Sequence, residues 1–258
     1  MSRFIDKLNR LSRAEPQPMG FRTKQSASPK PKIQLVASLA QESAESLADY
    51  VAGADAGLLR ISKPSSGTQT LQKMSQAMPD IPWGGWLQGS SLEKIKQMAK
   101  VGGDFVVFPA VNTPLVLLQN DEVGKILEVE ASLGEGLLRA VNELPIDAVL
   151  VTDKQREEGF LTWQHLVLFQ HFTDLLTKPL LVSIPSNVTA GELQTLWEAG
   201  VDGAVIEVTA GQPQDRLKEL RQVIDKLTFP SPRRREKMEP LLPYVSGEAS
   251  IVTEEEEE

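Results

Sequence analysis

Apolar positions along this chain follow two patterns, and the first is a repeated short phrase. In four stretches a glycine or proline stands two residues before an aspartate, and a β-rich apolar run follows at once: AGADAGLLRIS (52–62), VGGDFVVFPA (101–110), LPIDAVLVTD (144–153) and GVDGAVIEV (200–208). Four further apolar runs are KIQLVAS (32–38), IPWGGWLQG (81–89), KILEVEAS (125–132) and KPLLVSIPS (178–186). Short apolar runs bounded by turn residues predict buried β-strands, so the chain offers eight of them.

The segments between these runs have helical spacing. Apolar residues recur at i, i+3, i+4 and i+7 in 43–52, 91–100, 135–144, 163–176, 190–200 and 214–227, with weaker or shorter cases at 70–78 and 113–123. Alternating strands and helices indicate a parallel sheet, and eight such units predict a single (β/α)₈ barrel. The alternative is an open doubly wound sheet. Its Gly-rich phosphate loop is missing, because the first strand runs into SLAQESAES (38–46), which has no glycine.

The repeated phrase has a local explanation. Its glycines can adopt the left-handed conformation that ends a helix; they are Gly53, Gly102 or Gly103, and Gly200. An aspartate side chain accepts hydrogen bonds from nearby amides in a tight turn. Such helix-to-strand turns lie at the N-terminal rim of a barrel, where residues serve stability. We therefore expect structural and not catalytic roles for the four aspartates, Asp55, Asp104, Asp147 and Asp202.

Composition changes at both ends of the chain. Residues 1–31 predict an amphipathic helix with Phe4, Ile5, Leu8 and Leu11 on one side, followed by a linker rich in proline, serine and glutamine. Residues 229–258 contain SPRRREK and end in TEEEEE, which predicts a disordered charged tail. The barrel is therefore assigned to residues 32–228. We expect the helix to dock on the barrel; a protein partner or a membrane surface is the alternative.

Composition also excludes several classes of function. The chain has no cysteine, which excludes disulfides, thiolate nucleophiles and cysteine-based metal sites. The net charge of −8 argues against nucleic-acid binding, because neutralising phosphates requires a basic face. No apolar stretch has the length of a signal peptide or a membrane span, so a cytoplasmic protein without stable membrane association is expected.

Charged residues at strand ends are the strongest candidates for chemistry. Active sites of barrels lie at the C-terminal ends of the strands, and alternation predicts inward positions for Arg60, Glu128, Glu130 and Glu207. Charges in a dry lumen must pair, bind a ligand or titrate abnormally. One interpretation is a structural ion-pair layer around Arg60. The other is an active site in which Arg60 holds an anionic substrate and Glu130 or Glu207 acts as general acid or base.

Further candidates lie on the same rim. Lys63 and Lys154 follow the second and sixth strands; a buried lysine there would form a Schiff base with a carbonyl substrate, whereas an exposed one would be solvated. The loops after the seventh and eighth strands suit an anion, although Thr189 and Glu192 also fit a helix capping box. The candidate substrate-binding residues are Gln88, Ser183, Thr209 and Gly211.

No cofactor and no metal site are expected from the sequence, and a divalent metal held by Glu128, Glu130 and Glu207 is the minor alternative. His165 and His171 are the only histidines, and their spacing of six residues does not place them on one helix face as a two-histidine metal site requires. We interpret them as packing residues.

Two motifs resemble known barrel families. The GVDGAVIEV phrase resembles the aldolase-type and phosphate-binding (β/α)₈ barrels, in which a similar Gly-x-Asp turn precedes strands. The segment GGDFVVFPAVNTPLVLL (102–118) is similar to one in the 2-keto-3-deoxy-6-phosphogluconate aldolases. In that family the sixth strand carries a lysine, whereas Lys154 lies beyond the end of AVLVT here, and the Glu-Val-Thr-Leu-Arg strand is absent. The resemblance implies the fold and lyase-type chemistry, and no aldolase mechanism is transferred to individual residues.

Together these observations predict an aldolase-type barrel enzyme, of the lyase or isomerase class, that acts on a small anionic metabolite. The alternative is a non-catalytic barrel that serves as a binding or scaffold protein. A homo-oligomer, or a protein partner bound through the N-terminal helix, is kept open.

Overall fold

The computed structural model describes residues 2–12, 32–40, 44, 46, 48–61, 64–87, 96–98, 100–111, 113–115, 122–152, 159–209 and 211–227, with the backbone alone at 11, 12, 64 and 65. The predicted linker and charged tail therefore lie outside the described residues, as do Lys63, Gln88 and Lys154.

Eight parallel strands close into a barrel, in the order in which they occur along the chain. They are β1 Gln34–Ala40, β2 Ala56–Ile61, β3 Trp83–Leu87, β4 Phe105–Pro109, β5 Gly124–Glu130, β6 Ala148–Thr152, β7 Leu180–Ile184 and β8 Gly203–Glu207. β8 pairs with β1, from Gln34 opposite Gly203 to Ser38 opposite Glu207, and this pairing closes the sheet. Each strand overlaps a run that the sequence predicts, although β1 ends two residues later and β5 begins one residue earlier than predicted, so the (β/α)₈ prediction is confirmed and the open sheet is excluded.

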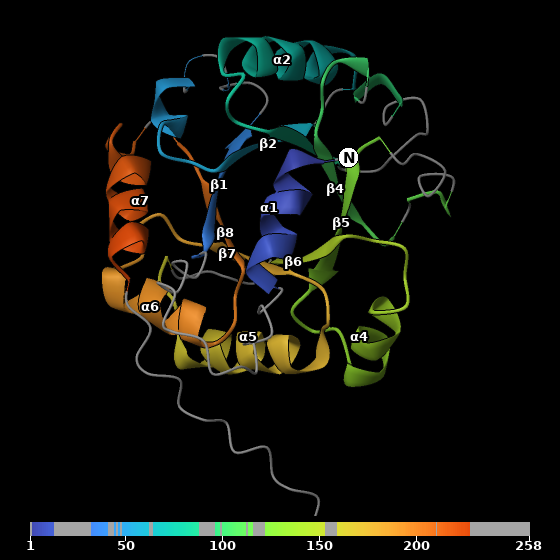
Figure 1. Cartoon of the computed structure of the whole chain (residues 1–258), viewed down its shortest axis with the longest axis vertical. Coiled ribbons are helices and arrows are strands. Elements are labelled where there is room, and N and C mark those ends of the chain that lie inside the picture. The colour runs from blue at the N-terminus through green and yellow to red at the C-terminus, as the bar shows by residue number, and fades with distance from the viewer. Residues whose placement is uncertain are drawn as a thin grey trace, which may run out of the picture. The chain divides into compact units, whose positions relative to one another are not determined.

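Helices surround the barrel (Figure 1). They are α2 Pro64–Ala77, α4 Glu135–Val141, α5 Trp163–Leu175, α6 Ala190–Glu198 and α7 Arg216–Lys226. Between β1 and β2 the described residues contain only a short 3₁₀ turn, η2 Ala48–Val51, where the sequence predicts a longer helix. Thr189 and Glu192 form the predicted capping box at the start of α6, because the hydroxyl accepts from the Glu192 amide while the carboxylate accepts from the Thr189 amide.

The strand side chains divide into two separate cores, as the alternation of a β-strand requires. One core fills the layer between the strands and the surrounding helices, and includes Leu35, Leu59, Val149 and Ile206. The other fills the barrel lumen with Val36, Ala56, Leu58, Trp86, Phe105, Val107, Ile126, Ala148, Leu150, Leu181 and Val205. Leu58, Ile126 and Val205 of this lumen core each stand two residues before a predicted inward residue. Since side chains alternate along a strand, Arg60, Glu128 and Glu207 lie on the lumen face, as predicted.

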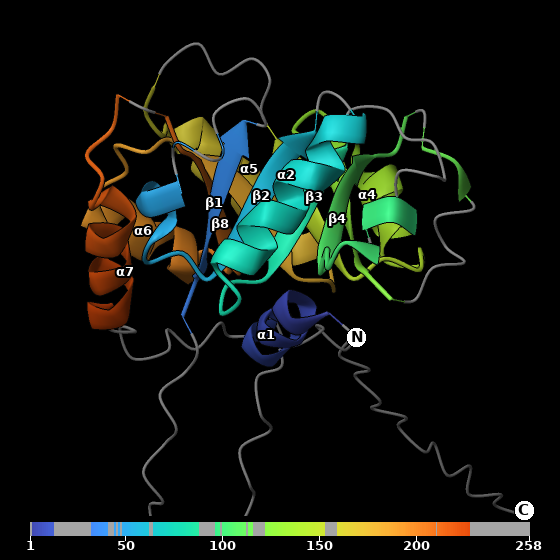
Figure 2. The same cartoon turned by 90° about the horizontal axis from the view of Figure 1, so that it is seen from above.

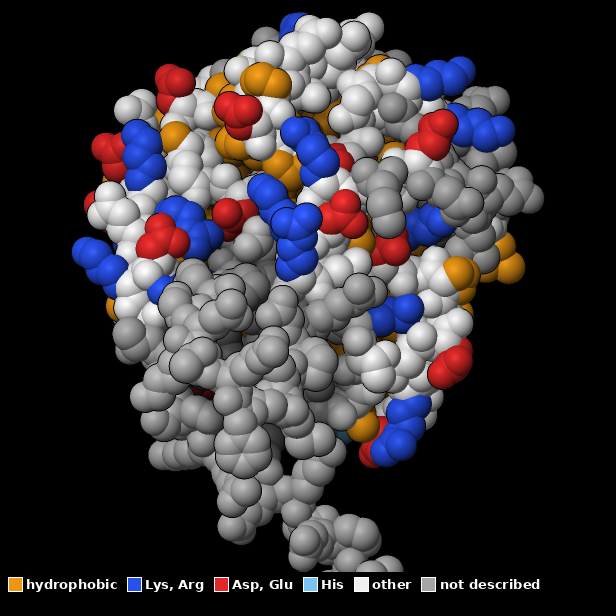
Figure 3. Space-filling model, viewed as in Figure 1, with side chains coloured by type: hydrophobic (Ala, Val, Ile, Leu, Met, Phe, Trp, Pro, Cys, Tyr) orange, Lys and Arg blue, Asp and Glu red, His pale blue; other side chains and the backbone are white. Residues whose placement is uncertain are grey.

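The N-terminal helix α1, Arg3–Ser12, covers the N-terminal end of the barrel (Figures 1 and 2). Phe4, Ile5 and Leu8 belong to the lumen core, and the rings of Phe4 and Phe105 lie 4.7 Å apart. Gly124 makes room for the helix, since a Cβ there would lie 2.4 Å from Ile5 Cγ1. The docking prediction is therefore confirmed. The exposed side of the helix carries basic residues (Figure 3).

The repeated aspartates close the helix-to-strand turns. In three turns the carboxylate accepts a hydrogen bond, of 2.7 to 2.9 Å, from the amide at the start of the preceding strand: Asp55 from Leu35, Asp147 from Lys125 and Asp202 from Leu180. Asp104 differs, because its carboxylate accepts instead from Ser2 Oγ and the amides of Arg3 and Phe4. The structural role predicted for the aspartates is confirmed, and one of the four also holds α1 in place.

Three glycines of these turns have positive φ angles: Gly53 at 97°, Gly102 at 89° and Gly200 at 91°. At Gly53 a Cβ would also lie 2.8 Å from the Cα of Lys218, so both the φ angle and the close approach of α7 require glycine there. The left-handed helix stops predicted from the sequence are therefore present in the described turns, with Gly102 and not Gly103 in that conformation.

The buried carboxyl of Asp202 should make the free energy of unfolding depend on pH. Burial raises its pKa from 3.8 to about 6, partly opposed by the hydrogen bond from Leu180. Because the pKa in the folded state exceeds the unfolded value, the protonated form stabilises the fold below about pH 4, and this contribution is lost as the pH rises to about 6. The free energy of unfolding of Asp202→Asn, relative to that of the parent, should therefore increase by about 2 kcal/mol between pH 4 and pH 7.

Urea unfolding at each pH measures this difference. Asp147→Asn is the matched control, since it removes a carboxylate with the same kind of backbone bond. A constant difference between Asp202→Asn and the parent across this pH range would contradict the prediction.

Candidate functional site

Polar and charged side chains gather at the C-terminal mouth of the barrel, opposite α1. Arg60, Glu128, Thr152 and Glu207 occupy the last or next-to-last inward positions of β2, β5, β6 and β8. The alternation that fills the lower lumen with apolar residues thus turns polar at the end where barrel active sites lie. We call these residues, with Trp86 of β3, the mouth cluster.

Arg60 is held from two sides. Its NH1 donates to Glu207 Oε1 at 3.3 Å, and its guanidinium carbon lies 4.7 Å from the centre of the Trp86 ring. The side chains of Arg60 and Glu207 are 33% and 52% exposed, so water screens this ion pair and its contribution to stability is small. The contact with Trp86 helps to hold the guanidinium in this position, because a cation is attracted to the face of an indole ring.

Glu128, on β5, holds the indole of Trp86 by a hydrogen bond. Its Oε2 accepts from the indole Nε1 at 2.8 Å, and its Oε1 accepts from Thr152 Oγ1 at 3.1 Å. Both carboxylate oxygens are therefore engaged, which leaves Glu128 less suited than Glu207 to exchange protons with a ligand. A chain of contacts runs from Thr152 through Glu128 and Trp86 to Arg60 and Glu207.

Two polar atoms of this region are buried without a hydrogen-bond partner among the described residues. They are Nε of Arg60 and Oγ of Ser38, which lies on β1 between the strands that carry Arg60 and Glu207. A buried donor without an acceptor costs about 1–3 kcal/mol, and such atoms are usually satisfied by water or a ligand.

The other predicted site residues have different positions. Glu130 is exposed at the end of β5, and Ser183 is half-buried on β7 at an inward position. Thr209 and Gly211 are exposed after β8, but α7 begins only at Arg216, so the anion site expected from its N-terminus is not directly beside them. Gln88 and Lys154 lie outside the described residues. Among these candidates, the contact between described residues that the structure shows is the one from Arg60 to Glu207.

Sequence reasoning missed Trp86. On the strand 81–89 it selected Gln88, the next residue of the same parity, although Trp86 is the residue that contacts both Arg60 and Glu128. An aromatic side chain at the inward end of a strand, two residues after Gly84, was the available signal. Within the described part of the chain, no group of three or more His, Asp or Glu side chains is placed to hold a metal ion.

Comparisons with known proteins find similarity in structure alone. No family model matches the chain, and no curated protein matches its sequence. A mutant tryptophan synthase alpha-subunit from Pyrococcus furiosus has a TM-score of 0.59 at 10% identity, covering 76% of this chain and 98% of that chain. A second mutant of the same subunit has a TM-score of 0.60 at 10% identity with the same coverage. A designed cube-shaped, porous protein cage of fused symmetric oligomeric domains has a TM-score of 0.55 at 17% identity, covering 76% of this chain and 72% of that one.

The chain is a TIM barrel. At these identities the similarity shows the shared fold, and it transfers neither substrate nor reaction. The short resemblance of 102–118 to the 2-keto-3-deoxy-6-phosphogluconate aldolases has no matching family model behind it. No helix in the described part of this TIM barrel is long and apolar enough to cross a membrane.

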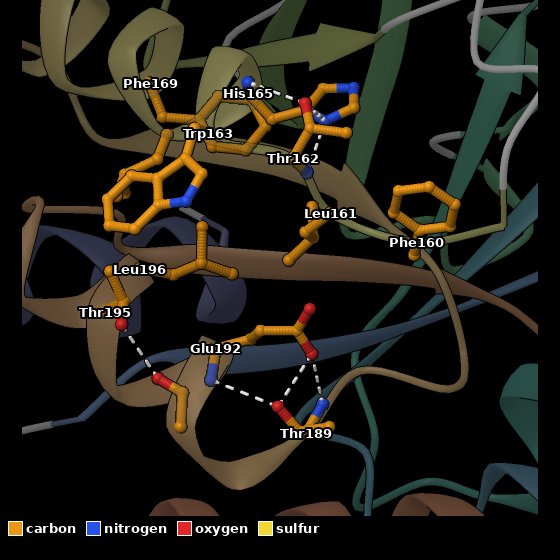
Figure 4. A pocket seen from close by; sticks show the side chains of 12 residues that line it. Phe160, Leu161, Thr162, Trp163, His165, Phe169, Thr189, Glu192, Thr195 and Leu196 are labelled. Carbon is orange, nitrogen blue, oxygen red and sulfur yellow. Dashed lines mark hydrogen bonds between the residues drawn. The ribbon is translucent and has the colours of Figure 1, made fainter.

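A groove lies outside the TIM-barrel lumen, between the N-terminal ends of α5 and α6. This groove of about 650 Å³ is lined mainly by apolar side chains, including Phe160, Leu161, Trp163 and Leu196. Figure 4 shows Thr162 with His165 at one side of the groove and Thr189 with Glu192 at the other. Both pairs are capping boxes, so His165 and Glu192 are engaged in starting their helices and provide no acid–base pair.

The positions of the two histidines differ from the packing role that the sequence predicts. His165 caps α5 through Nδ1, which lies 3.0 Å from the Thr162 amide, and so it is a capping residue and not only a packing residue. His171 is exposed, with an edge-on contact to Phe172, so the packing interpretation is wrong for it. Trp163 is 83% exposed, although its helical spacing suggests a buried face.

Proposed function

We propose that this TIM barrel is an enzyme that binds a small anionic metabolite in its C-terminal mouth through Arg60. Lyase or isomerase chemistry, without a cofactor or metal, is the class that we favour. The observation that carries the proposal is the state of Arg60: among the described residues it stacks on Trp86, bonds to Glu207 through one nitrogen, and keeps a buried Nε without an acceptor. A fixed guanidinium with free donors is suited to bind an anion.

General acid–base catalysis is assigned to the carboxylates beside this anion. Glu207 contacts Arg60 and is half-exposed, so it can reach a bound substrate and exchange a proton with it. Glu130, exposed at the end of β5, is the second candidate. Ser183, Thr209, Gly211 and Gln88 are proposed to contact the rest of the substrate, and Lys154 remains a candidate nucleophile. A cytoplasmic location is proposed from the absence of cysteine.

The alternative is a non-catalytic barrel that binds or organises a partner. The contacts that favour it are those in which the mouth residues satisfy one another, namely Thr152 and Trp86 with Glu128 and Arg60 with Glu207. In that case the mouth cluster serves stability alone. A homo-oligomer, or a partner on the exposed side of α1, belongs to this second proposal, because the apolar side of that helix is covered by the barrel.

A thermal-shift screen with small anionic metabolites, repeated on Arg60→Ala, separates the two proposals. The enzyme proposal expects one ligand class to raise the melting temperature of the parent by about 5–10 °C at a hundred times the dissociation constant, which corresponds to about 2.7 kcal/mol of stabilisation. Arg60→Ala should lose this response while losing less than about 1 kcal/mol of stability, because the Arg60 ion pair is partly exposed. No response from any ligand, together with a large loss of stability in the variant, supports the scaffold.

A further inference from the structure

We propose that the group bound by Arg60 is a singly charged carboxylate and not a phosphate, and that the hydroxyl of Ser38 is its second donor. This inference rests on the proposed function, because it assigns the chemical class of the anion that the mouth binds. It is carried by three observations: the free edge of Arg60, the buried hydroxyl of Ser38 and the balance of charge around them.

The free edge of Arg60 has the geometry that a carboxylate requires. A guanidinium carries five N–H donors, and among the described residues this one makes a single hydrogen bond, from NH1 to Glu207. Nε is buried without an acceptor there and NH2 makes no hydrogen bond among those residues, so the edge formed by Nε and NH2 has no protein acceptor, while the guanidinium carbon lies 4.7 Å from the centre of the Trp86 ring. Two parallel N–H donors on one edge match the two oxygens of a carboxylate, and Glu207 can stay in place on NH1.

Ser38 points to the same ligand. It is 1% exposed, and its Oγ has no hydrogen-bond partner in the part of the chain that the structure describes. Its side chain faces the lumen by alternation with Val36, and in register it stands beside Leu58 of β2 and Glu207 of β8. β1 therefore places this hydroxyl between the strand that carries Arg60 and the strand that carries Glu207. Buried hydroxyls are normally satisfied, so a ligand oxygen in the lumen is the partner that this position fits.

The charge of the described strand ends at the mouth favours a ligand with a single negative charge. Among the described residues at the inward strand ends, Arg60 is the cation and Glu128, Glu130 and Glu207 are carboxylates. A phosphate ester carries about −1.5 to −2 charges at pH 7, whereas a carboxylate carries one. The extra charge would be repelled by Glu207, which already neutralises part of the guanidinium, so a carboxylate is favoured.

Two three-carbon probes that share a pair of hydroxyls test the class of anion. Glycerate carries a carboxylate and two hydroxyls, and glycerol 3-phosphate carries a phosphate and the same hydroxyls. Titration into the ¹⁵N-labelled full chain at pH 7.5 is followed by the Nε–H signal of Arg60, which is assigned by its loss in Arg60→Lys. Glycerate should move this signal with a dissociation constant at least about tenfold lower than that of glycerol 3-phosphate.

Substitutions test the two assigned roles. Ser38→Ala should weaken glycerate binding by about fivefold, the effect of one hydrogen bond, without lowering the melting temperature, because among the described residues the hydroxyl has no partner to lose. Ser75→Ala, at a half-buried serine of α2 outside the lumen, is the control and should leave binding unchanged. Glu207→Gln should reduce the preference for glycerate over glycerol 3-phosphate by about tenfold, because it removes one carboxylate beside Arg60.

Each result of these titrations tests one part of the proposal. Tighter binding of glycerol 3-phosphate, lost in Arg60→Ala, overturns the carboxylate assignment and leaves the proposed function standing. Unchanged glycerate affinity in Ser38→Ala overturns the role of Ser38. If neither probe moves the Arg60 signal, the inference is wrong, and the proposed function is then decided by the broader metabolite screen. If that screen also gives no Arg60-dependent response, both fail.

Discussion

Replacing Phe4 by alanine is expected to lower the free energy of unfolding by about 3–5 kcal/mol, the cost of removing a buried phenyl ring. Phe4 is fully buried, and its ring lies 4.7 Å from that of Phe105 in the lumen core. The substitution leaves a cavity at the N-terminal end of the barrel that Ile5 and Leu8 cannot fill while the helix stays in its register. Urea unfolding followed by circular dichroism measures the loss.

The control for Phe4 is an exposed apolar residue. Leu137 of α4 is 62% exposed, so Leu137→Ala should change stability by less than about 0.5 kcal/mol. Phe4→Leu, which keeps most of the volume, should cost less than Phe4→Ala. A loss below about 1 kcal/mol in Phe4→Ala would mean that α1 contributes little to the folded barrel.

Asp104→Ala should destabilise the protein by about 3 kcal/mol, because its carboxylate accepts from the first two amides of α1 and from the Ser2 hydroxyl that caps the Ile5 amide. Its oxygens accept from Ser2 Oγ and from the amides of Arg3 and Phe4, at 2.8 to 2.9 Å. The first amides of a helix have no partner within it, and a negative charge at this end also favours the helix dipole. The measurement is urea unfolding combined with hydrogen exchange of the α1 amides.

Asp147 is the matched control for Asp104. It lies in an equivalent turn and accepts a hydrogen bond from the amide of Lys125, so Asp147→Ala should cost less than half as much. Hydrogen exchange distinguishes the two: Asp104→Ala should speed exchange in α1 while β1 and β8 stay protected. Equal losses in both variants, with α1 exchange unchanged, would contradict the role of Asp104 as the cap.

The periodicity of the strands predicts only part of the mouth cluster. The two-residue period of a strand decides which side chains share a face, and this period alone places Arg60, Glu128 and Glu207 inward. It does not say which of them meet. Arg60 and Glu207 are 147 residues apart, and Trp86 and Glu128 are 42 apart, so their contacts depend on barrel closure and on the tilt of the strands. Trp86 was missed for this reason.

The sequence by itself determined the number of strands, their parallel order and the structural role of the Gly-x-Asp turns, because these follow from short-range periodicity and from the φ angles that glycine allows. Tertiary structure alone decided what each polar group contacts. Asp104 could have bonded the preceding strand as Asp55, Asp147 and Asp202 do, but the docked α1 offers it two amides and a hydroxyl. The same holds for Ser38, whose hydroxyl lacks a partner among the described residues only because barrel closure buries it in the lumen.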